Sequence, residues 1–356
     1  MDSSLQNLLI AMHRREASDL HLVPGYPPTY RIHGELAAAN NGSAIGHDAV
    51  KAMVEKIVPP GLFSRLETGS DIDFAFQIDT PQGTWRFRGN VFSSRGALGA
   101  CFRAIPEQIP TLPELGFPTD LGVRLISQKD GLVLVTGITG SGKTTSLASL
   151  IQMLNTKGGH RIITIEEPIE YIYPQSGASI ITQREVGVDV PSFYEGLRSG
   201  LRQDPDVLLV GEIRDMDTAQ LAISAAETGH LILATMHTRD AKGAITRMID
   251  LFPTERHDDI RTQLSMSLRF VVAQHLLPSA AGGRRVLAME IMTANYAVRN
   301  AIRNGKIESL DSAIQSGRAE GMISLDTDLR RLIDTGQIST ETARTYANDI
   351  SEFRER

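Results

Sequence analysis

The sequence predicts an α/β protein with a smaller second domain, and three observations lead to this fold class. An apolar, strand-like run, Leu132–Thr136, enters the glycine-rich segment Gly137–Thr144, and a helix-like run, Lys143–Asn155, follows it. Residues 117–292 alternate strand-like and helix-like segments, which is typical of a mainly parallel sheet covered by helices on both faces. Residues 1–104 mix helices with runs of adjacent strands, which indicates an α+β domain built on a small antiparallel sheet.

Composition narrows the class of protein. The chain has 356 residues, enough for two or three domains, and its 41% hydrophobic and 22% charged content is that of a soluble globular protein. A net charge of −6 argues against a nucleic-acid binder that works by bulk electrostatics. The only cysteine, Cys101, excludes an intrachain disulfide and a cysteine-based zinc site. We expect no signal peptide and no integral membrane segment, and therefore a cytoplasmic protein.

The elements of the first domain follow from residue periodicity. A helix is expected over Ser4–Arg15, because its leucines and Met12 fall on one helical face. A linker is expected at residues 105–116, where three prolines interrupt any period. The remaining expected elements are a helix over His47–Ile57 that ends at Pro59-Pro60, and strands over Ser18–Val23, Tyr30–Glu35, Asp73–Ile78, Thr84–Phe92 and Ala97–Ala104.

The second domain, residues 117–292, is expected to alternate strands and helices, and residues 293–356 are expected to be wholly helical. The expected strands are Leu132–Thr136, Arg161–Ile165, Val207–Val210, Leu231–Thr235 and Val286–Ile291. The expected helices are Lys143–Asn155, Phe193–Arg202, Thr218–Glu227 and Glu255–Arg269.

The glycine-rich segment Gly137–Thr144 fits G-x-x-x-x-G-K-[ST], the P-loop, in the required context of strand, loop and helix. Its glycines let backbone N–H groups converge on phosphate oxygens, and the new helix directs its positive end at the same anion. Lys143 is expected to reach the β- and γ-phosphates of ATP, and Thr144 to supply its hydroxyl to Mg²⁺. The residues expected to bind nucleotide here are Thr139, Gly140, Ser141, Gly142, Lys143, Thr144 and Thr145.

Carboxylates follow two of the expected strands, at the edge of the sheet where ligands bind. Glu166, Glu167 and Glu170 surround a proline turn. Any one of them alone would be interpreted as a solvated acid. Together, beside a P-loop, they indicate a metal and water site. Asp206–Glu212 resembles a Walker B strand in which Gly211 stands where many such motifs have aspartate, so that Glu212 alone is left for the metal or the attacking water. Mg²⁺ needs only one or two carboxylates.

Histidines and arginines complete the set of candidates. His237 follows the strand Leu231–Thr235 and is expected to donate a hydrogen bond toward a γ-phosphate, whereas His230, before that strand, fits either this role or a structural one. Guanidinium groups stabilise the charge of phosphoryl transfer. The candidates are Arg88, Arg95, Arg103, Arg198, Arg202 and Arg214.

These motifs resemble those of the secretion-superfamily hexameric ATPases, and most closely of the type IV pilus retraction ATPases. The P-loop resembles the Walker A motif of this family, and Ala226–Thr238 resembles its His box. Ile163–Tyr171 resembles the Asp box, with Glu167 in place of the usual aspartate, and Leu209–Asp215 resembles Walker B. Residues 297–304 resemble a helical motif associated with retraction, from which they depart at Val298, Ala301 and Asn304.

The resemblance implies a RecA-like ATPase core with a PAS-like N-terminal domain and a helical C-terminal extension. It implies a homohexamer that hydrolyses ATP with Mg²⁺, withdraws pilin subunits and drives twitching motility. Glu170 would be the Asp-box catalytic acid and Glu212 the Walker B acid, and which of the two polarises water stays open. Arg88 and Arg103 would close over the nucleotide. The implied partner is an inner-membrane platform protein at the pilus base, with an accessory retraction ATPase as a further partner.

Alternatives remain at this point. Assembly and type II secretion ATPases usually carry a four-cysteine zinc insertion, which a chain with only Cys101 lacks. An accessory retraction ATPase shares the length and architecture. A motor dependent on nucleic acid would use the same core, but the acidic balance of the chain disfavours it. A nucleotide-binding switch without hydrolysis would make Glu170 and Glu212 incidental.

Overall fold

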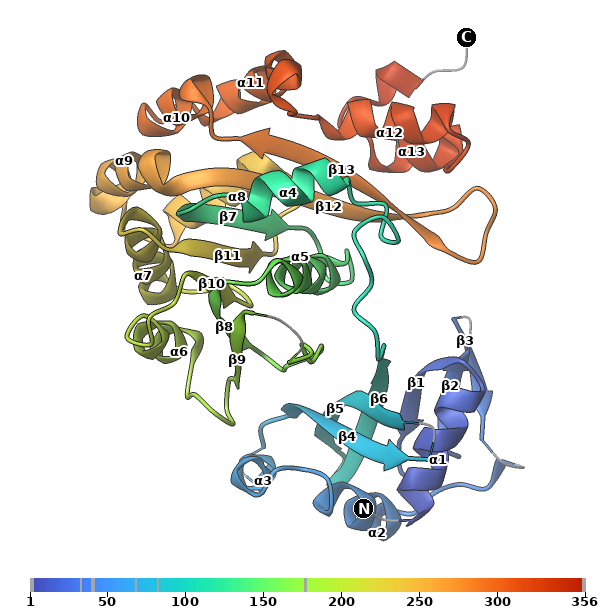
Figure 1. Ribbon diagram of the computed structural model, residues 1–356. Coiled ribbons are helices and arrows are strands. Elements are labelled where there is room, and N and C mark those ends of the chain that lie inside the picture. The colour runs from blue at the N-terminus through green and yellow to red at the C-terminus, as the bar shows by residue number, and fades with distance from the viewer. Residues whose placement is uncertain are drawn as a thin grey trace. The chain divides into compact units, whose positions relative to one another are not determined.

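The computed structural model describes residues 3–32, 34–39, 42–67, 69–81, 83–175 and 178–353. The chain divides into two compact units, each with its own sheet (Figure 1). The first unit comprises Met1–Ile109 together with two later segments, Glu167–Ile172 and Arg184–Pro191. The second unit comprises Pro110–Glu166, Tyr173–Gln183 and Ser192–Arg356.

The first unit is built on a six-stranded antiparallel sheet of order β3-β2-β1-β6-β5-β4. The three predicted strands at its C-terminal end become β4, β5 and β6, and their inward phenylalanines Phe74, Phe87 and Phe102 are almost completely buried together with Leu5 and Leu9. Its elements are α1 Ser3–Arg14, β1 Ala17–Leu22, β2 Thr29–Ile32, β3 Glu35–Ala38, α2 His47–Glu55, α3 Pro60–Glu67, β4 Ile72–Thr80, β5 Gly83–Ser94 and β6 Ala97–Ile105.

Two elements of the first unit were not predicted. Pro60 was expected to end a helix, but it opens α3 instead, a position where the missing N–H of proline costs nothing. Strand β3 is four residues long and mostly exposed, so it carries no hydrophobic pattern that could have indicated it.

The second unit contains a seven-stranded sheet of order β13-β12-β7-β11-β10-β8-β9. The five strands from β12 to β8 run parallel, with the P-loop strand β7 between β12 and β11, and β13 pairs antiparallel with β12. This is the α/β architecture with a mainly parallel sheet that the sequence predicts. The strands are β7 Gly131–Thr136, β8 Arg161–Glu166, β9 Ile180–Glu185, β10 Val207–Val210, β11 Leu231–Met236, β12 Leu268–Pro278 and β13 Arg285–Thr293.

Helices connect the strands of this unit and continue to its C-terminal end. The core helices are α4 Thr119–Ile126, α5 Lys143–Lys157, α6 Phe193–Gly200, α7 Met216–Glu227, α8 Ala241–Asp250 and α9 His257–Ser267, with the 3-10 turn η2 Thr254–Arg256. The C-terminal elements are α10 Tyr296–Arg303, η3 Ile307–Ser309, α11 Leu310–Ser316, η4 Gly317–Glu320, α12 Leu325–Asp334, α13 Thr340–Tyr346 and η5 Ile350–Phe353. Every helix in the described part of the chain is too short or too polar to cross a bilayer.

One predicted helix is wrong at its end. The helix expected over Glu255–Arg269 stops at Ser267, and the chain continues as the long strand β12. Its residues from Phe270 to Ala273 are nearly or fully buried because this strand lies inside the sheet, between β7 and β13. A continuous apolar run has neither the helical nor the alternating period, so its sequence did not reveal a strand.

Candidate nucleotide-binding site

The P-loop connects β7 to α5, and its shape requires glycine at two positions. Gly137 has φ 148°, and a Cβ placed there would lie 2.3 Å from Ser141 Oγ and 2.5 Å from the Gln274 carbonyl oxygen. Gly142, the N-cap of α5, has φ 92°, which a residue with a side chain rarely adopts. The loop therefore folds as the motif predicts, with the N-terminus of a helix of 15 residues at its end.

Among the described residues, the Lys143 ammonium group of this loop bonds only to neutral oxygens, and the Ser141 hydroxyl has no hydrogen-bond partner. Lys143 is only 8% exposed, and its Nζ donates to the neutral carbonyls of Gly137 at 2.8 Å and Ile138 at 3.1 Å. Burial lowers the pKa of Lys143, against an opposing effect of Glu212. Ser141 Oγ is buried without a hydrogen-bond partner among the described residues. A buried cation and an unpaired hydroxyl beside a helix N-terminus are suited to an anion.

The remaining predicted loop residues surround these two groups. Thr139, Gly140 and Thr144 are exposed, and Gly142 and Thr145 are half-buried. Arg285 donates from NH1 to the Gly140 carbonyl at 3.2 Å. The exposed residues of the loop are thus among those that the motif predicts to bind phosphate.

Three predicted residues meet at the carboxyl ends of β10 and β11. Arg214 Nε lies 2.7 Å from Glu212 Oε2, and His237 Nε2 lies 3.3 Å from the same oxygen. The Glu212 side chain is 15% exposed. Glu212 also acts electrostatically on Lys143. This acid is therefore held in place by two side-chain contacts, and its role as the Walker B residue stays a prediction.

Gly211, which stands where aspartate was expected, has little room for a side chain. A Cβ there would meet the Ile165 carbonyl oxygen at 3.0 Å and a ring carbon of Phe193 at 3.1 Å. Its backbone is held on both sides, because its N–H donates to Ile165 at 2.8 Å and its carbonyl accepts from Thr235 Oγ1 at 2.5 Å. The close approach of β8 to β10 accounts for the glycine.

The glutamates of the acidic turn after β8 differ in their surroundings. Glu166 is 6% exposed within the second unit, where its Oε1 accepts from Thr164 Oγ1 at 2.6 Å and Gln183 Nε2 at 3.2 Å. A solvated position is therefore wrong for this glutamate. Glu167 and Glu170 belong to the first unit.

Glu170 lies beside arginines of the first unit. Arg88 NH1 is 3.6 Å from Glu170 Oε1, and Arg88 NH2 is 3.4 Å from Asp73 Oδ1. Arg103 is opposite Arg88 in the β5–β6 register and is paired with Asp19 at 2.8 Å. Burial raises the pKa of Glu170, while Arg88 and Arg103 lower it. Two of the six candidate arginines thus converge on the predicted Asp-box acid.

Other candidates have local roles. His230 Nδ1 lies 3.1 Å from the Ala225 carbonyl oxygen at the end of α7, which agrees with a structural role for this histidine. Arg198 pairs with Glu195 along α6 at 3.2 Å. Arg95 occupies the β5–β6 turn with φ 53°. None of these contacts places His230, Arg198 or Arg95 beside Glu212 or Glu170.

Gln274 is a site residue that the motifs did not indicate. It lies on β12, fully buried, and its Nε2 donates to Ser146 Oγ of α5 at 2.8 Å, while its carbonyl lies against Gly137. It thus contacts the P-loop at Gly137 and the first turn of α5 at Ser146. The only signal in the sequence was a glutamine within the apolar run Phe270–Leu277.

Within the described ranges, no group of three or more His, Cys, Asp or Glu side chains is placed to hold a metal ion. A parallel sheet with a P-loop, an acid and a histidine at the adjoining strand ends defines the class of P-loop nucleotide hydrolases.

Comparisons with known proteins place the chain within that class. A profile of the type II/IV secretion system protein family matches residues 103–356. The type IV pilus retraction ATPase PilT of Pseudomonas aeruginosa is 43% identical over 98% of this chain and 99% of its own length. The type IV pilus ATPase PilU of the same organism is 35% identical over 98% of this chain and 90% of its own. A crystal structure of the pilus retraction motor PilT with bound ADP has a TM-score of 0.87 at 39% identity, over 97% of both chains.

The chain therefore belongs to the type II/IV secretion system protein family. Its resemblance to the pilus retraction ATPases, its fold class and its identification as a nucleotide-binding ATPase are confirmed.

Proposed function

We propose that this chain is the motor ATPase that retracts type IV pili and so drives twitching motility. The observation that carries the proposal is a likeness to a retraction ATPase that covers both chains from end to end at 43% identity. The site supports it, because the P-loop and the Glu212 cluster form the groups that ATP hydrolysis requires. The greater identity to PilT than to PilU, at equal coverage of this chain, favours the principal motor over an accessory one.

In this proposal each site residue has a role in hydrolysis. Residues 139–145 bind the phosphates and Lys143 neutralises them, in exchange for its present carbonyl partners. The Thr144 hydroxyl and the Glu212 carboxylate would hold Mg²⁺, an ion that needs only a small set of oxygen donors from the protein. When bound, that ion neutralises the charge that develops on the phosphates.

Glu212 and Glu170 are the two acids available to orient or deprotonate the attacking water. His237 stabilises Glu212 and donates toward the γ-phosphate. Arg88 and Arg103, which lie beside Glu170, act on the nucleotide. The domain boundaries belong to the same proposal: a PAS-like domain at 1–104, a linker at 105–116, a RecA-like core at 117–292 and a helical region at 293–356.

The assembled motor is a homohexamer at the cytoplasmic side of the inner membrane, peripheral to the pilus base. Its partner there is the platform protein, and an accessory retraction ATPase joins it in some systems. Nucleic acid is not a substrate, in keeping with a net charge of −6.

The test is to delete the gene and to count surface pili and measure surface motility, with wild-type and Lys143→Ala chains as complements. Many pili without movement, restored by the wild-type chain alone, is the expected result. Loss of pili would assign the chain to assembly, and normal pili with normal movement would contradict the proposal. Light scattering of the purified chain with nucleotide checks the hexamer.

A further inference from the structure

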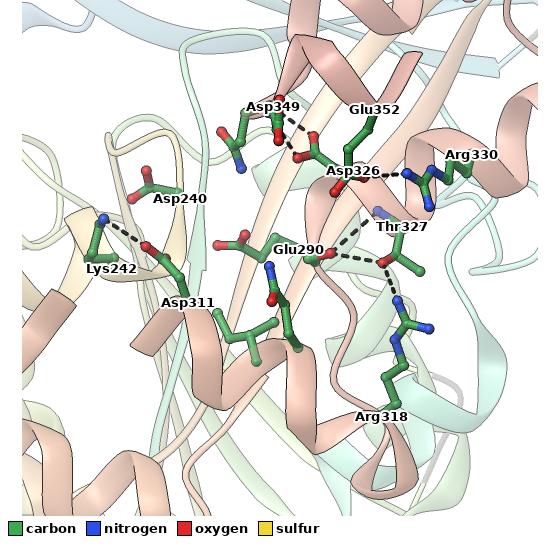
Figure 2. A pocket seen from close by; sticks show the side chains of 14 residues that line it. Asp240, Lys242, Glu290, Asp311, Arg318, Asp326, Thr327, Arg330, Asp349 and Glu352 are labelled. Carbon is green, nitrogen blue, oxygen red and sulfur yellow. Dashed lines mark hydrogen bonds and ion pairs between the residues drawn. The ribbon is translucent and has the colours of Figure 1, made fainter. Parts of the chain in front are cut away.

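A cavity of about 480 Å³ lies in the second unit, among α8, β13 and the C-terminal helices (Figure 2). Glu290 of β13 lines it and is only 5% exposed. In Figure 2 this side chain stands between Asp240 and Lys242 on one side and Thr327 and Arg318 on the other. None of the hydrolysis steps above uses this buried carboxylate.

Glu290 joins the first residues of two helices. Its Oε1 accepts from the backbone N–H of Ala241 at 2.9 Å, where α8 begins. The backbone N–H of Leu325, where α12 begins, favours the charged form of the same carboxylate and lowers its pKa. Each helix N-terminus carries unsatisfied N–H groups and partial positive charge, so one carboxylate stabilises both. Helix α8 belongs to the ATPase core, whereas α12 belongs to the C-terminal region.

The α8 end of this contact leads directly to the nucleotide-binding residues. Helix α8 follows His237 after a loop of three residues, and its N-cap Asp240 accepts from Gly243 N–H at 2.5 Å. Within the loop, Thr238 N–H donates to Thr136 Oγ1 at 3.0 Å, and Thr136 is the last residue before the P-loop. We therefore expect a displacement of His237 or of the P-loop to reach the first turn of α8 through this short loop and its hydrogen bond to the Thr136 side chain.

The α12 end is fixed to the same strand. Met289 N–H donates to Asp328 Oδ2 of α12 at 2.9 Å, and Ile291 pairs with Ile323 just before that helix. At the far side, Asp326 accepts from the backbone N–H groups of Asn348 at 2.8 Å and Asp349 at 3.0 Å. Hydrogen bonds thus link α12 to β13 on one side and to residues 348–349 on the other.

We propose that Glu290 is a positioning residue that couples the His237–Asp240 loop of the ATPase site to the C-terminal helices. The carboxylate keeps α8 and α12 in register, so that a change in nucleotide state at the loop is transmitted to α12 and catalysis depends on the contact. The inference rests on the proposed ATPase activity and adds a route by which hydrolysis reaches the surface of the motor.

The environment of Glu290 makes the coupling sensitive to pH. Burial raises its pKa to about 7, and Asp240 and Asp311 raise it as well, against the two backbone hydrogen bonds. Below that pH the carboxyl is protonated and serves the two N–H donors less well, so coupling is expected to weaken as pH falls from 8 to 6. Burial lowers the pKa of His275, which lies 2.9 Å from the Arg239 carbonyl. The charged groups that line the cavity around Glu290 are Asp240, Lys242, Asp311, Arg318, Asp326, Arg330, Asp349 and Glu352.

The experiment compares the full chain with Glu290→Gln, which mimics the protonated acid, and with Glu352→Gln as a matched control. Glu352 lines the same cavity but pairs with Arg330 at its exposed side. For Glu290→Gln we expect kcat at pH 8 to fall about tenfold, as for a residue on a coupling route, with KM for ATP within about twofold. The step in kcat between pH 6 and 8 should disappear. Glu352→Gln should keep the wild-type kcat and the step.

Hydrogen exchange gives a readout that does not need turnover. A non-hydrolysable ATP analogue with Mg²⁺ should slow exchange in residues 325–334 of the wild-type chain, and this response should be at least halved in Glu290→Gln. Glu290→Asp, which keeps the charge on a shorter side chain, should restore the pH step with an intermediate kcat.

An unchanged kcat, pH profile and exchange response in Glu290→Gln would overturn the coupling alone. A variant that only melts at a lower temperature, with those three properties unchanged, would reduce Glu290 to a structural residue. If the wild-type chain does not hydrolyse ATP, the proposed function fails first and the coupling with it.

Discussion

Glu170 and Glu212 both follow predicted strands in the sequence, yet the structure holds them differently. Glu212 lies in the second unit, where one of its oxygens contacts Arg214 at 2.7 Å and His237 at 3.3 Å. Glu170 lies in the first unit, where Arg88 approaches it at 3.6 Å and burial raises its pKa. Glu212 is held by two side-chain contacts, whereas the pKa of Glu170 is raised by burial and lowered by two arginines.

The difference indicates that the two acids have different roles in hydrolysis. An acid held by two donors has one orientation, which suits a residue that positions an ion or a water. An acid whose charged form depends on nearby guanidinium groups is one whose protonation those groups can adjust, which suits proton transfer. The following changes test whether the two acids are in fact unequal.

The largest loss is expected for Lys143→Ala. The change removes the cation that neutralises the phosphates, and ATP hydrolysis should fall about 1000-fold or more. Because, among the described residues, Nζ bonds only to the loop carbonyls of Gly137 and Ile138, the melting temperature without nucleotide should stay close to that of the wild type. A steady-state phosphate-release assay and a thermal melt measure the two effects. A collapse of the melting temperature would show that the lysine holds the fold instead.

Glu212→Gln should follow, with kcat lowered about 100-fold and nucleotide binding retained, because the amide keeps the shape but not the charge. Glu195→Gln, which removes an exposed carboxylate paired with Arg198, is the matched control and should behave as the wild type. Binding of a fluorescent ATP analogue separates the two effects. Wild-type turnover in Glu212→Gln would show that the charge of Glu212 is not needed to position the ion or the water.

Glu170→Gln and Arg88→Ala test the other side of the comparison. Glu170→Gln should lower kcat about tenfold and remove an acid limb from the pH profile, because the carboxylate must lose its proton to act. Burial raises the pKa of Glu170 and Arg88 lowers it, so Arg88→Ala should move that limb to higher pH with a smaller loss at pH 8. A limb that stays in place in Arg88→Ala would separate the arginine from the acid.

The sequence predicted the strand, loop and helix of the P-loop because that arrangement is local. The turn at Gly137, the cap at Gly142 and the acid after β10 depend on residues a few positions apart. The grouping of Glu170 with Arg88 and that of Glu290 with Ala241 depend on contacts between distant segments. Strand β12 escaped prediction because burial on both sides removes the period that marks a strand. The unexpected glycine at 211 is explained only by the distance to β8.

Gly211→Ala is expected to have the smallest effect, and it tests why a glycine occupies this position. A methyl group would press on the Ile165 carbonyl and on Phe193, at 3.0 Å and 3.1 Å, and both would have to give by a few tenths of an ångström. Overpacking of this kind should cost about 1 kcal/mol of unfolding free energy, measured by urea denaturation. Hydrolysis should remain near wild type, because Glu212 keeps its contacts with Arg214 and His237. A large loss of turnover with little loss of stability would instead mean that the strand end must stay narrow for Glu212 to reach its target.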